Sequence, residues 1–96
     1  MSNSYETIMV LSTKLDEDAT KAMIEKFTNL IADNGGTVES IDEWGKRRLA
    51  YEIQKEAEGY YVLINFSCPP DFIAELNRVY NITDGILRTI VTRQNA

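Results

Sequence analysis

The 96-residue sequence contains no histidine, one cysteine and two prolines. The absence of histidine removes the commonest general base and metal ligand in proteins, which leaves little support for an enzyme. Cys68 has no partner for an internal disulfide, and this fits a reducing, cytosolic setting. No charged-then-apolar leader opens the chain, and no apolar run approaches the roughly 20 residues of a membrane helix. We therefore expect a soluble cytoplasmic protein with no catalytic residues, metal, cofactor, membrane contact or small-molecule substrate.

Positive charge is also scarce. Ten Lys and Arg residues stand against fifteen Asp and Glu residues, which gives a formal net charge of -5. A general nucleic-acid coat is normally strongly basic, so this balance argues against one. The deficit lies in residues 1–45, which hold three cations and nine acids, whereas residues 46–96 hold seven and six. Any contact with nucleic acid should therefore be small, local or shared with a basic partner.

Other potential sites lack the residues that their chemistry needs. Cys68 precedes two prolines and has no histidine to activate it, so we interpret it as a structural thiol. The run Asp16-Glu17-Asp18 lacks the spaced ligands and the glycine of a calcium loop and is better explained by helix capping. Gly35-Gly36 is a turn and not a phosphate-binding loop. An acylphosphatase-like activity would need an arginine loop where the chain has Ser12-Thr13-Lys14.

The sequence does contain alternating extended and helical patterns. Short runs rich in β-branched and aromatic residues predict strands over residues 5–11, 37–53, 60–67 and 86–92. Helical apolar spacing predicts a helix from an Asp16 N-cap to a stop at 34–36, and a second from Pro69-Pro70-Asp71 to Asn81. Gly45 predicts a bulge inside the long second strand. The polar segment 55–59 predicts the hairpin loop after it.

This order of elements predicts an α+β fold of the ferredoxin-like βαββαβ type, in one domain spanning residues 1–96. We expect a four-stranded antiparallel sheet with both helices on one face, and the first and third strands at its centre. The second face then has no helix to cover it. Apolar residues on that face would point to a protein partner, and the candidates are Ile8, Val10, Leu63 and Ile90.

The run Trp44-Gly45-Lys46-Arg47-Arg48-Leu49-Ala50-Tyr51 concentrates three cations in an otherwise acidic chain. One interpretation is a solvated strand that uses charge to discourage edge pairing. The other is a contact site, since these side chains suit phosphates and carboxylates and the bracketing aromatics suit bases or a protein. Arg88 and Arg93, on the last strand and its exit, would add cations at the opposite end of the sheet.

The segment 58–66 is loosely similar to the longer signature of an RNA-recognition motif, on the matching strand of the same topology. It has Glu58 in place of the leading cation, and the first strand lacks the paired aromatic. Alternation assigns Tyr60, Val62, Ile64 and Phe66 to the core, whereas base stacking requires exposed rings. A stand-alone RNA-binding domain of this type is the alternative function.

The chain resembles the bacterial small-subunit ribosomal protein six family over nearly its whole length. The run 44–51, with its specific Gly-x-Arg-Arg-Leu-Ala-Tyr pattern, matches the central signature of that family. Supporting matches are Tyr5-Glu6, Gly59-Tyr60-Tyr61, Pro69 with the helix after it, and Arg88. The chain differs from some members at Ser2-Asn3-Ser4, where they are basic, and after Arg93, where they continue into a longer tail.

The resemblance implies a non-catalytic structural constituent of the small ribosomal subunit. It implies binding to the central domain of small-subunit ribosomal RNA together with small-subunit ribosomal protein eighteen, a small basic protein. Such a partner would explain how an acidic chain can bind RNA. The residues implied in RNA or partner contact are Lys46, Arg47 and Arg48, followed by Arg88 and Arg93.

Overall fold

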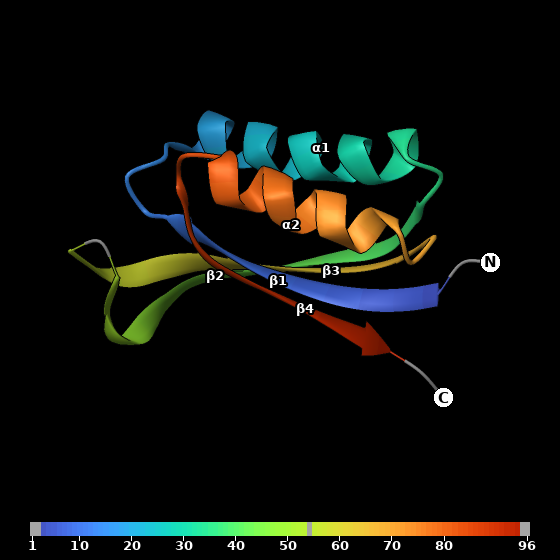
Figure 1. Cartoon of the computed structure of the whole chain (residues 1–96). Helices are drawn as coiled ribbons and strands as arrows, with labels where there is room; N and C mark the ends of the chain where they lie inside the picture. The colour runs from blue at the N-terminus through green and yellow to red at the C-terminus, as the bar shows by residue number, and fades with distance from the viewer. Residues whose placement is uncertain (1–2, 54, 95–96) are drawn as a thin grey trace.

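The computed structural model describes residues 3–53 and 55–94, and in Figure 1 both helices lie on one side of a twisted sheet. The elements are β1 (Asn3–Ser12), α1 (Glu17–Asp33), β2 (Thr37–Ile53), β3 (Glu56–Cys68), α2 (Phe72–Ile82) and β4 (Ile86–Gln94). The strand order is β2-β3-β1-β4, and all neighbouring strands are antiparallel. The predicted ferredoxin-like α+β fold is confirmed, with the first and third strands at the centre.

Alternation along the two central strands separates the core from the side of the sheet that faces away from the helices, here called the open face. Met9 of β1 and Val62 of β3 are fully buried and belong to the same core as Phe27 of α1 and Leu76 of α2. Residues 61, 63 and 65 of β3 alternate with the core residues and are half-buried. The predicted assignment of 62, 64 and 66 to the core is confirmed.

The start and end of α1 follow local signals that the sequence carries. The Asp16 carboxylate accepts a hydrogen bond from the Ala19 amide at 2.7 Å, and two further acids occupy the first turn, where the helix dipole favours them. The helix ends at Asp33 with Asn34 as its C-cap, and Gly35 follows with a φ of 83°, a conformation that favours glycine. The predicted N-cap and stop are both confirmed.

The second helix begins slightly later than the proline signal suggests. The predicted opening at Pro69-Pro70-Asp71 is a turn, whose proline carbonyls accept hydrogen bonds from the amides of Phe72 and Ile73 at 3.0 and 3.3 Å. The helix proper runs from Phe72 to Ile82. The prolines therefore lead into the helix rather than occupying its first turn.

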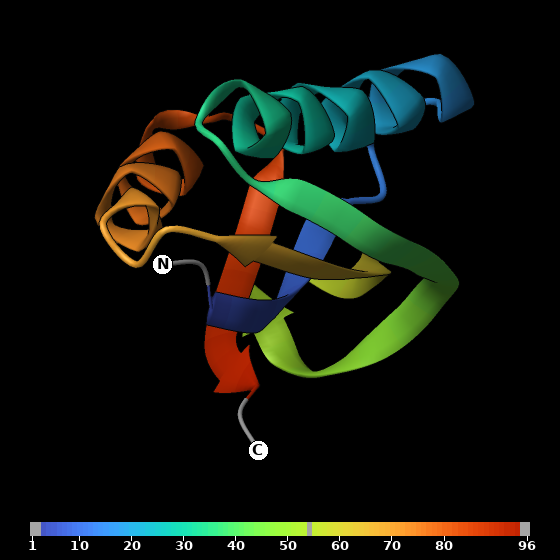
Figure 2. The same ribbon diagram turned by 90° about the vertical axis from the view of Figure 1, so that its right-hand side faces the viewer.

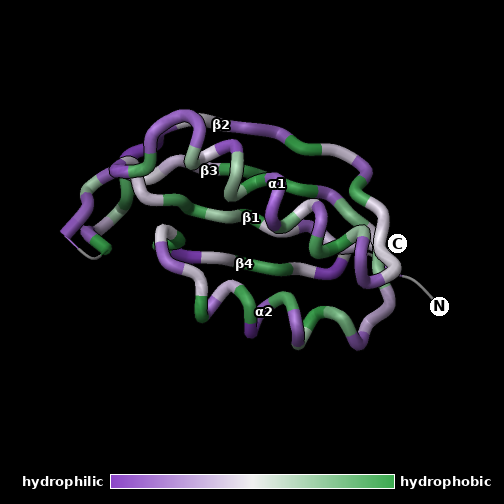
Figure 3. Tube along the Cα trace, turned by 90° about the horizontal axis from the view of Figure 1, so that it is seen from above, coloured by the Kyte–Doolittle hydropathy of each residue, from purple (hydrophilic) through white to green (hydrophobic). Residues whose placement is uncertain are grey.

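The long edge strand β2 is bent and largely hydrophilic. Its register against β3 shifts between Glu43 and Gly45, and Gly45 has a φ of 82°. The predicted bulge is confirmed. Beyond it, the second half of β2 curls beneath the sheet on the open face (Figure 2). Hydrophilic stretches are more prominent on β2 than on the central strands (Figure 3).

The predicted hairpin loop over residues 55–59 is wrong in extent. β2 continues to Ile53 and β3 already begins at Glu56. Although Glu56 lies in a polar stretch of sequence, its side chain is buried and accepts hydrogen bonds from the end of β1. The sequence pattern favoured a loop because the residues around Glu56 do not indicate that its carboxylate accepts a hydrogen bond from the distant Ser12.

A buried hydrogen bond joins the sheet to α2 and predicts a response to alkaline pH. The hydroxyls of Thr7 and Tyr80 lie 3.0 Å apart, and burial raises the pKa of Tyr80 to about 12, although the bond to Thr7 lowers it. In the unfolded chain the pKa of a tyrosine is about 10. The contribution of Tyr80 to the free energy of unfolding is therefore complete below pH 10 and lost as pH rises towards 12.

We expect the free energy of unfolding to fall over this window by on the order of 2–3 kcal/mol from Tyr80 alone. Denaturant titrations of the parent chain and of Tyr80→Phe at several pH values measure this contribution of Tyr80 to the free energy of unfolding. The Phe variant is expected to lose less stability between pH 10 and 12. Equal losses in the two proteins would contradict the assignment.

Candidate nucleic-acid and partner interface

The three adjacent cations, Lys46, Arg47 and Arg48, are exposed on the edge strand β2 directly after the Gly45 bend. Residues opposite one another in an antiparallel ladder share a face of the sheet. Arg47 is opposite Gly59, whereas Lys46 is opposite Tyr60, which packs against the core. The cluster is therefore divided, with Arg47 towards the open face and its two neighbours towards the helix side.

Arg88 lies at the same end of the sheet as this cluster, and the prediction that it lies at the opposite end is wrong. Ladder partners place Arg88, Val10, Tyr61 and Gly45 in one row across the four strands. The Arg88 guanidinium also donates a hydrogen bond of 3.4 Å to the Tyr51 hydroxyl. The curl of β2 brings its second half towards β4 at this end.

Arg93 lies at the far end, as predicted. It is opposite Tyr5, which is in turn opposite Phe66, and Phe66 is opposite Val38 near the start of β2. Its guanidinium donates a hydrogen bond of 3.4 Å to the Asn3 side-chain oxygen. The structure therefore brings Arg47 and Arg88 onto one end of the open face and leaves Arg93 away from them.

Aromatic side chains line the same end. Trp44 and Tyr61 stack with ring centroids 6.2 Å apart and an interplanar angle of 12°. The Trp44 indole nitrogen donates to the Asp42 carboxylate at 2.9 Å, which fixes the ring. Tyr51 is 64% exposed. The sequence analysis singled out Trp44 and Tyr51 but not Tyr61. The available signal was the alternation along β3, which places Tyr61 on the face opposite to the core residues.

The two acids that precede the Gly45 bend, Asp42 and Glu43, are occupied by aromatic partners. The Tyr60 hydroxyl donates to the Glu43 carboxylate at 2.7 Å, and this bond, followed by burial, raises the pKa of Tyr60. In the described part of the chain, the ion pairs are Lys21–Glu17 and Arg78–Glu75, both within helices. The cations of the cluster thus have no carboxylate partner among residues 3–53 and 55–94.

The open face is apolar at its centre. Leu63, Ile8 and Ile90 are adjacent across β3, β1 and β4 and are here called the apolar row. Ile90 is 43% exposed, and the other two are half-buried. The expectation that Val10 adds to this surface is wrong, because Val10 is only 4% exposed. A Cβ atom at Gly59 would approach both Val10 and Leu49, so the curled half of β2 covers Val10.

A family model described as ribosomal protein S6 matches residues 4–93 of this chain. The chain belongs to the ribosomal protein S6 family. Small ribosomal subunit protein bS6 of Caldanaerobacter subterraneus is 58% identical over 90 residues, which cover 94% of this chain and 95% of that protein. The Clostridium novyi protein of the same name is 56% identical over 88 residues, which cover 92% and 93%.

A solved structure supports the same family. The crystal structure of 30S ribosomal protein S6 from Thermotoga maritima superposes with a TM-score of 0.92 at 27% identity, over 98% of this chain and 89% of that chain. The family consists of structural ribosomal proteins of the small subunit, not known enzymes. The resemblance predicted from the run 44–51 is therefore confirmed.

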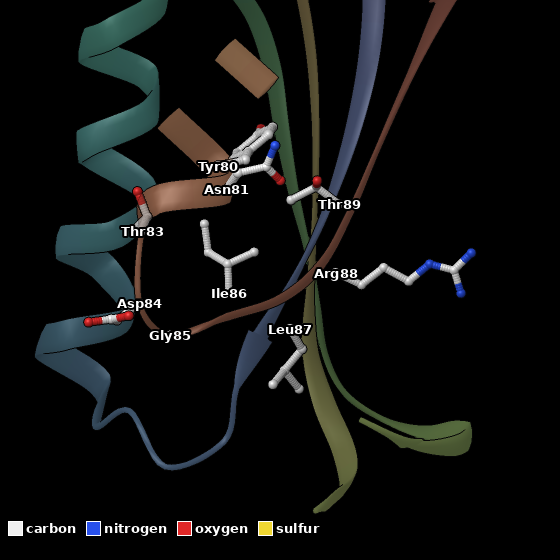
Figure 4. A pocket seen from close by; sticks show the side chains of 9 residues that line it. All are labelled: Tyr80, Asn81, Thr83, Asp84, Gly85, Ile86, Leu87, Arg88 and Thr89. Carbon is white, nitrogen blue, oxygen red and sulfur yellow. The ribbon is translucent and has the colours of Figure 1, made fainter. Parts of the chain in front are cut away.

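Elsewhere in residues 3–53 and 55–94 we find no built site of a different kind. A hollow of about 400 Å³ lies at the turn between α2 and β4, but Arg88 points away from the polar groups that line it (Figure 4). Among the described residues, no group of three or more Cys, Asp and Glu side chains is placed to hold a metal ion. Cys68 is buried, and burial raises the pKa of its thiol. Of the helices described, none combines the length and apolar character needed to span a membrane.

Proposed function

We propose that this chain is a structural constituent of the small ribosomal subunit that binds the central domain of small-subunit ribosomal RNA together with small-subunit ribosomal protein eighteen. One domain, residues 1–96, would carry this role in the cytoplasm, without catalysis, cofactor or membrane contact. The proposal extends the family membership to particular partners. The observation that carries it is that Arg47 and Arg88 lie at the same end of the open face, beside the apolar row.

Two kinds of surface sit side by side, and each suits a different partner. Arginines with no carboxylate partner in the described part of the chain, beside stacked aromatics, suit the phosphates and bases of RNA. The apolar row suits the apolar surface of a protein. A net charge of -5 opposes RNA binding by this chain alone, and a basic partner would offset it. We assign Arg47 and Arg88 as the primary contacts, with Lys46, Arg48 and Arg93 at the periphery.

The alternative is a stand-alone domain of the RNA-recognition-motif type. That mode needs exposed rings on the central strands for base stacking. In this chain Phe66 is fully buried and Tyr60 packs against the core. The alternative therefore lacks the rings that its own signature would supply.

A filter-binding titration separates the two proposals. The probe is a transcript of the central domain of small-subunit ribosomal RNA, titrated with this chain alone, protein eighteen alone and an equimolar mixture. We expect the mixture to bind about 5- to 150-fold more tightly than either protein alone, the range of a typical coupling between two ligands. Tight binding by this chain alone, unchanged by the partner, would instead favour the stand-alone domain.

A further inference from the structure

Glu56, at the start of β3, is a buried carboxylate outside the interface that accepts several hydrogen bonds. It is 9% exposed, and Ser12, whose single hydroxyl donor lies 2.9 and 2.8 Å from its two oxygens, is 7% exposed. The Thr13 amide donates to it at 3.0 Å and the Thr13 hydroxyl at 3.4 Å. We call these three residues the Glu56 clamp. Burying a carboxylate is costly unless such bonds compensate, so the clamp is a specific arrangement.

The Glu56 clamp joins three connections that are far apart in sequence. The Ser12 hydroxyl accepts a hydrogen bond from the Lys14 amide at 3.1 Å, which orders the turn between β1 and α1. The Ser12 amide donates to the Gly85 carbonyl at 2.8 Å, in the turn before β4. One side chain of the β2–β3 hairpin is thereby linked to the start of β4 through the end of β1.

This link connects the two strands that carry the interface. Arg47 is opposite Gly59, three residues from Glu56, and Arg88 follows Gly85 by three residues. β2 and β4 are opposite edges of the sheet and share no ladder. Regular pairing of β2 with β3 also lapses between Arg48 and Ile53, so the ladder alone does not fix the end of the hairpin.

We propose that Glu56 is a positioning residue for RNA binding: its clamp holds the hairpin against β1, so that Arg47 and Arg88 are presented together to the phosphates of RNA. This inference rests on the function proposed above. A carboxylate suits this role because it accepts the single Ser12 hydroxyl proton, with both oxygens within reach, and also the two Thr13 donors. A glutamine keeps one acceptor oxygen and presents an amide donor in place of the other, and an alanine offers neither.

The test compares Glu56→Ala, Glu56→Gln and Ser12→Ala in the titration with protein eighteen and the RNA transcript. Glu58→Ala is the matched control, since Glu58 is an exposed acid of the same hairpin. Removing an acid near the cations should by charge alone tighten anion binding. We expect Glu58→Ala to bind as tightly as the parent or more tightly, Glu56→Ala about tenfold more weakly, and Glu56→Gln between them.

A second comparison distinguishes positioning from general loss of structure. Arg47→Ala should weaken binding less in the Glu56→Ala background than in the parent, because an arginine that is no longer positioned already contributes less to binding. Hydrogen exchange of the amides of residues 46–53 should accelerate in Glu56→Ala, while exchange within α2 stays unchanged.

The proposal is wrong if Glu56→Ala folds and binds RNA and partner like the parent chain. If Glu56→Ala does not fold, Glu56→Gln and Ser12→Ala decide in its place, and binding like the parent by both would overturn the proposal. Fully additive effects of Glu56→Ala and Arg47→Ala would also overturn it. If the parent itself fails to bind, the proposed function fails instead. The exchange measurement then still decides whether Glu56 orders the hairpin.

Discussion

Replacing Arg47 and Arg48 together with alanine should weaken assembly with RNA and protein eighteen by about 10- to 100-fold, because the primary contact, Arg47, would lose one charge-assisted hydrogen bond to a phosphate, worth about 1.5–3 kcal/mol. Both side chains are exposed on β2 and have no carboxylate partner in the described part of the chain. The free energy of unfolding should therefore change by less than about 0.5 kcal/mol. Filter binding and denaturant titration measure the two quantities.

The salt dependence of binding gives an independent reading of the same variant. Each lost phosphate contact should reduce the slope of log K against log salt by about 1. The matched control is Lys21→Ala with Lys26→Ala, which removes two exposed cations from α1 on the other side of the sheet. If this control weakens binding equally, the effect is one of net charge. If the arginine variant unfolds, the cluster is structural and the site assignment is wrong.

Phe27→Ala should lower the free energy of unfolding by about 3–5 kcal/mol, the usual effect of removing a buried phenylalanine. Phe27 is fully buried on the inner side of α1, and its ring centroid lies 4.5 Å from that of Tyr80 on α2. The loss is a large part of the roughly 5–15 kcal/mol that stabilises a domain of this size. Denaturant titration of the two proteins measures it.

Ile82→Ala is the matched control for this variant, since Ile82 is an apolar helix residue that is 67% exposed. Its effect should stay below about 0.5 kcal/mol. A Phe27→Ala variant that loses less than about 1 kcal/mol would show that the contact between α1 and α2 matters less than burial indicates.

The fold was predictable because its local signals agree with one another. Asp16 as N-cap, the glycines after α1, the bulge at Gly45 and the alternation along β3 all appear in the structure as the sequence indicates. Each signal depends on neighbours within a few positions, which a sequence displays directly.

The arrangement of the interface was less predictable, because it depends on contacts between distant segments. The proximity of Arg88 to Tyr51 follows from the curl of β2. Gly45 indicated a bend in this strand, but the residues do not indicate its direction or which strand it approaches. Glu56 similarly resembles any glutamate of a polar loop until Ser12, 44 positions away, supplies its donor.

Purification of small ribosomal subunits from cells that express this chain tests whether the chain is held on the subunit together with protein eighteen. We expect the chain to sediment with the small subunit at about one copy per subunit, and to leave the subunit when protein eighteen is absent. The proposed function is wrong if the chain stays at the top of the gradient, or if it remains on the subunit at the same level without protein eighteen.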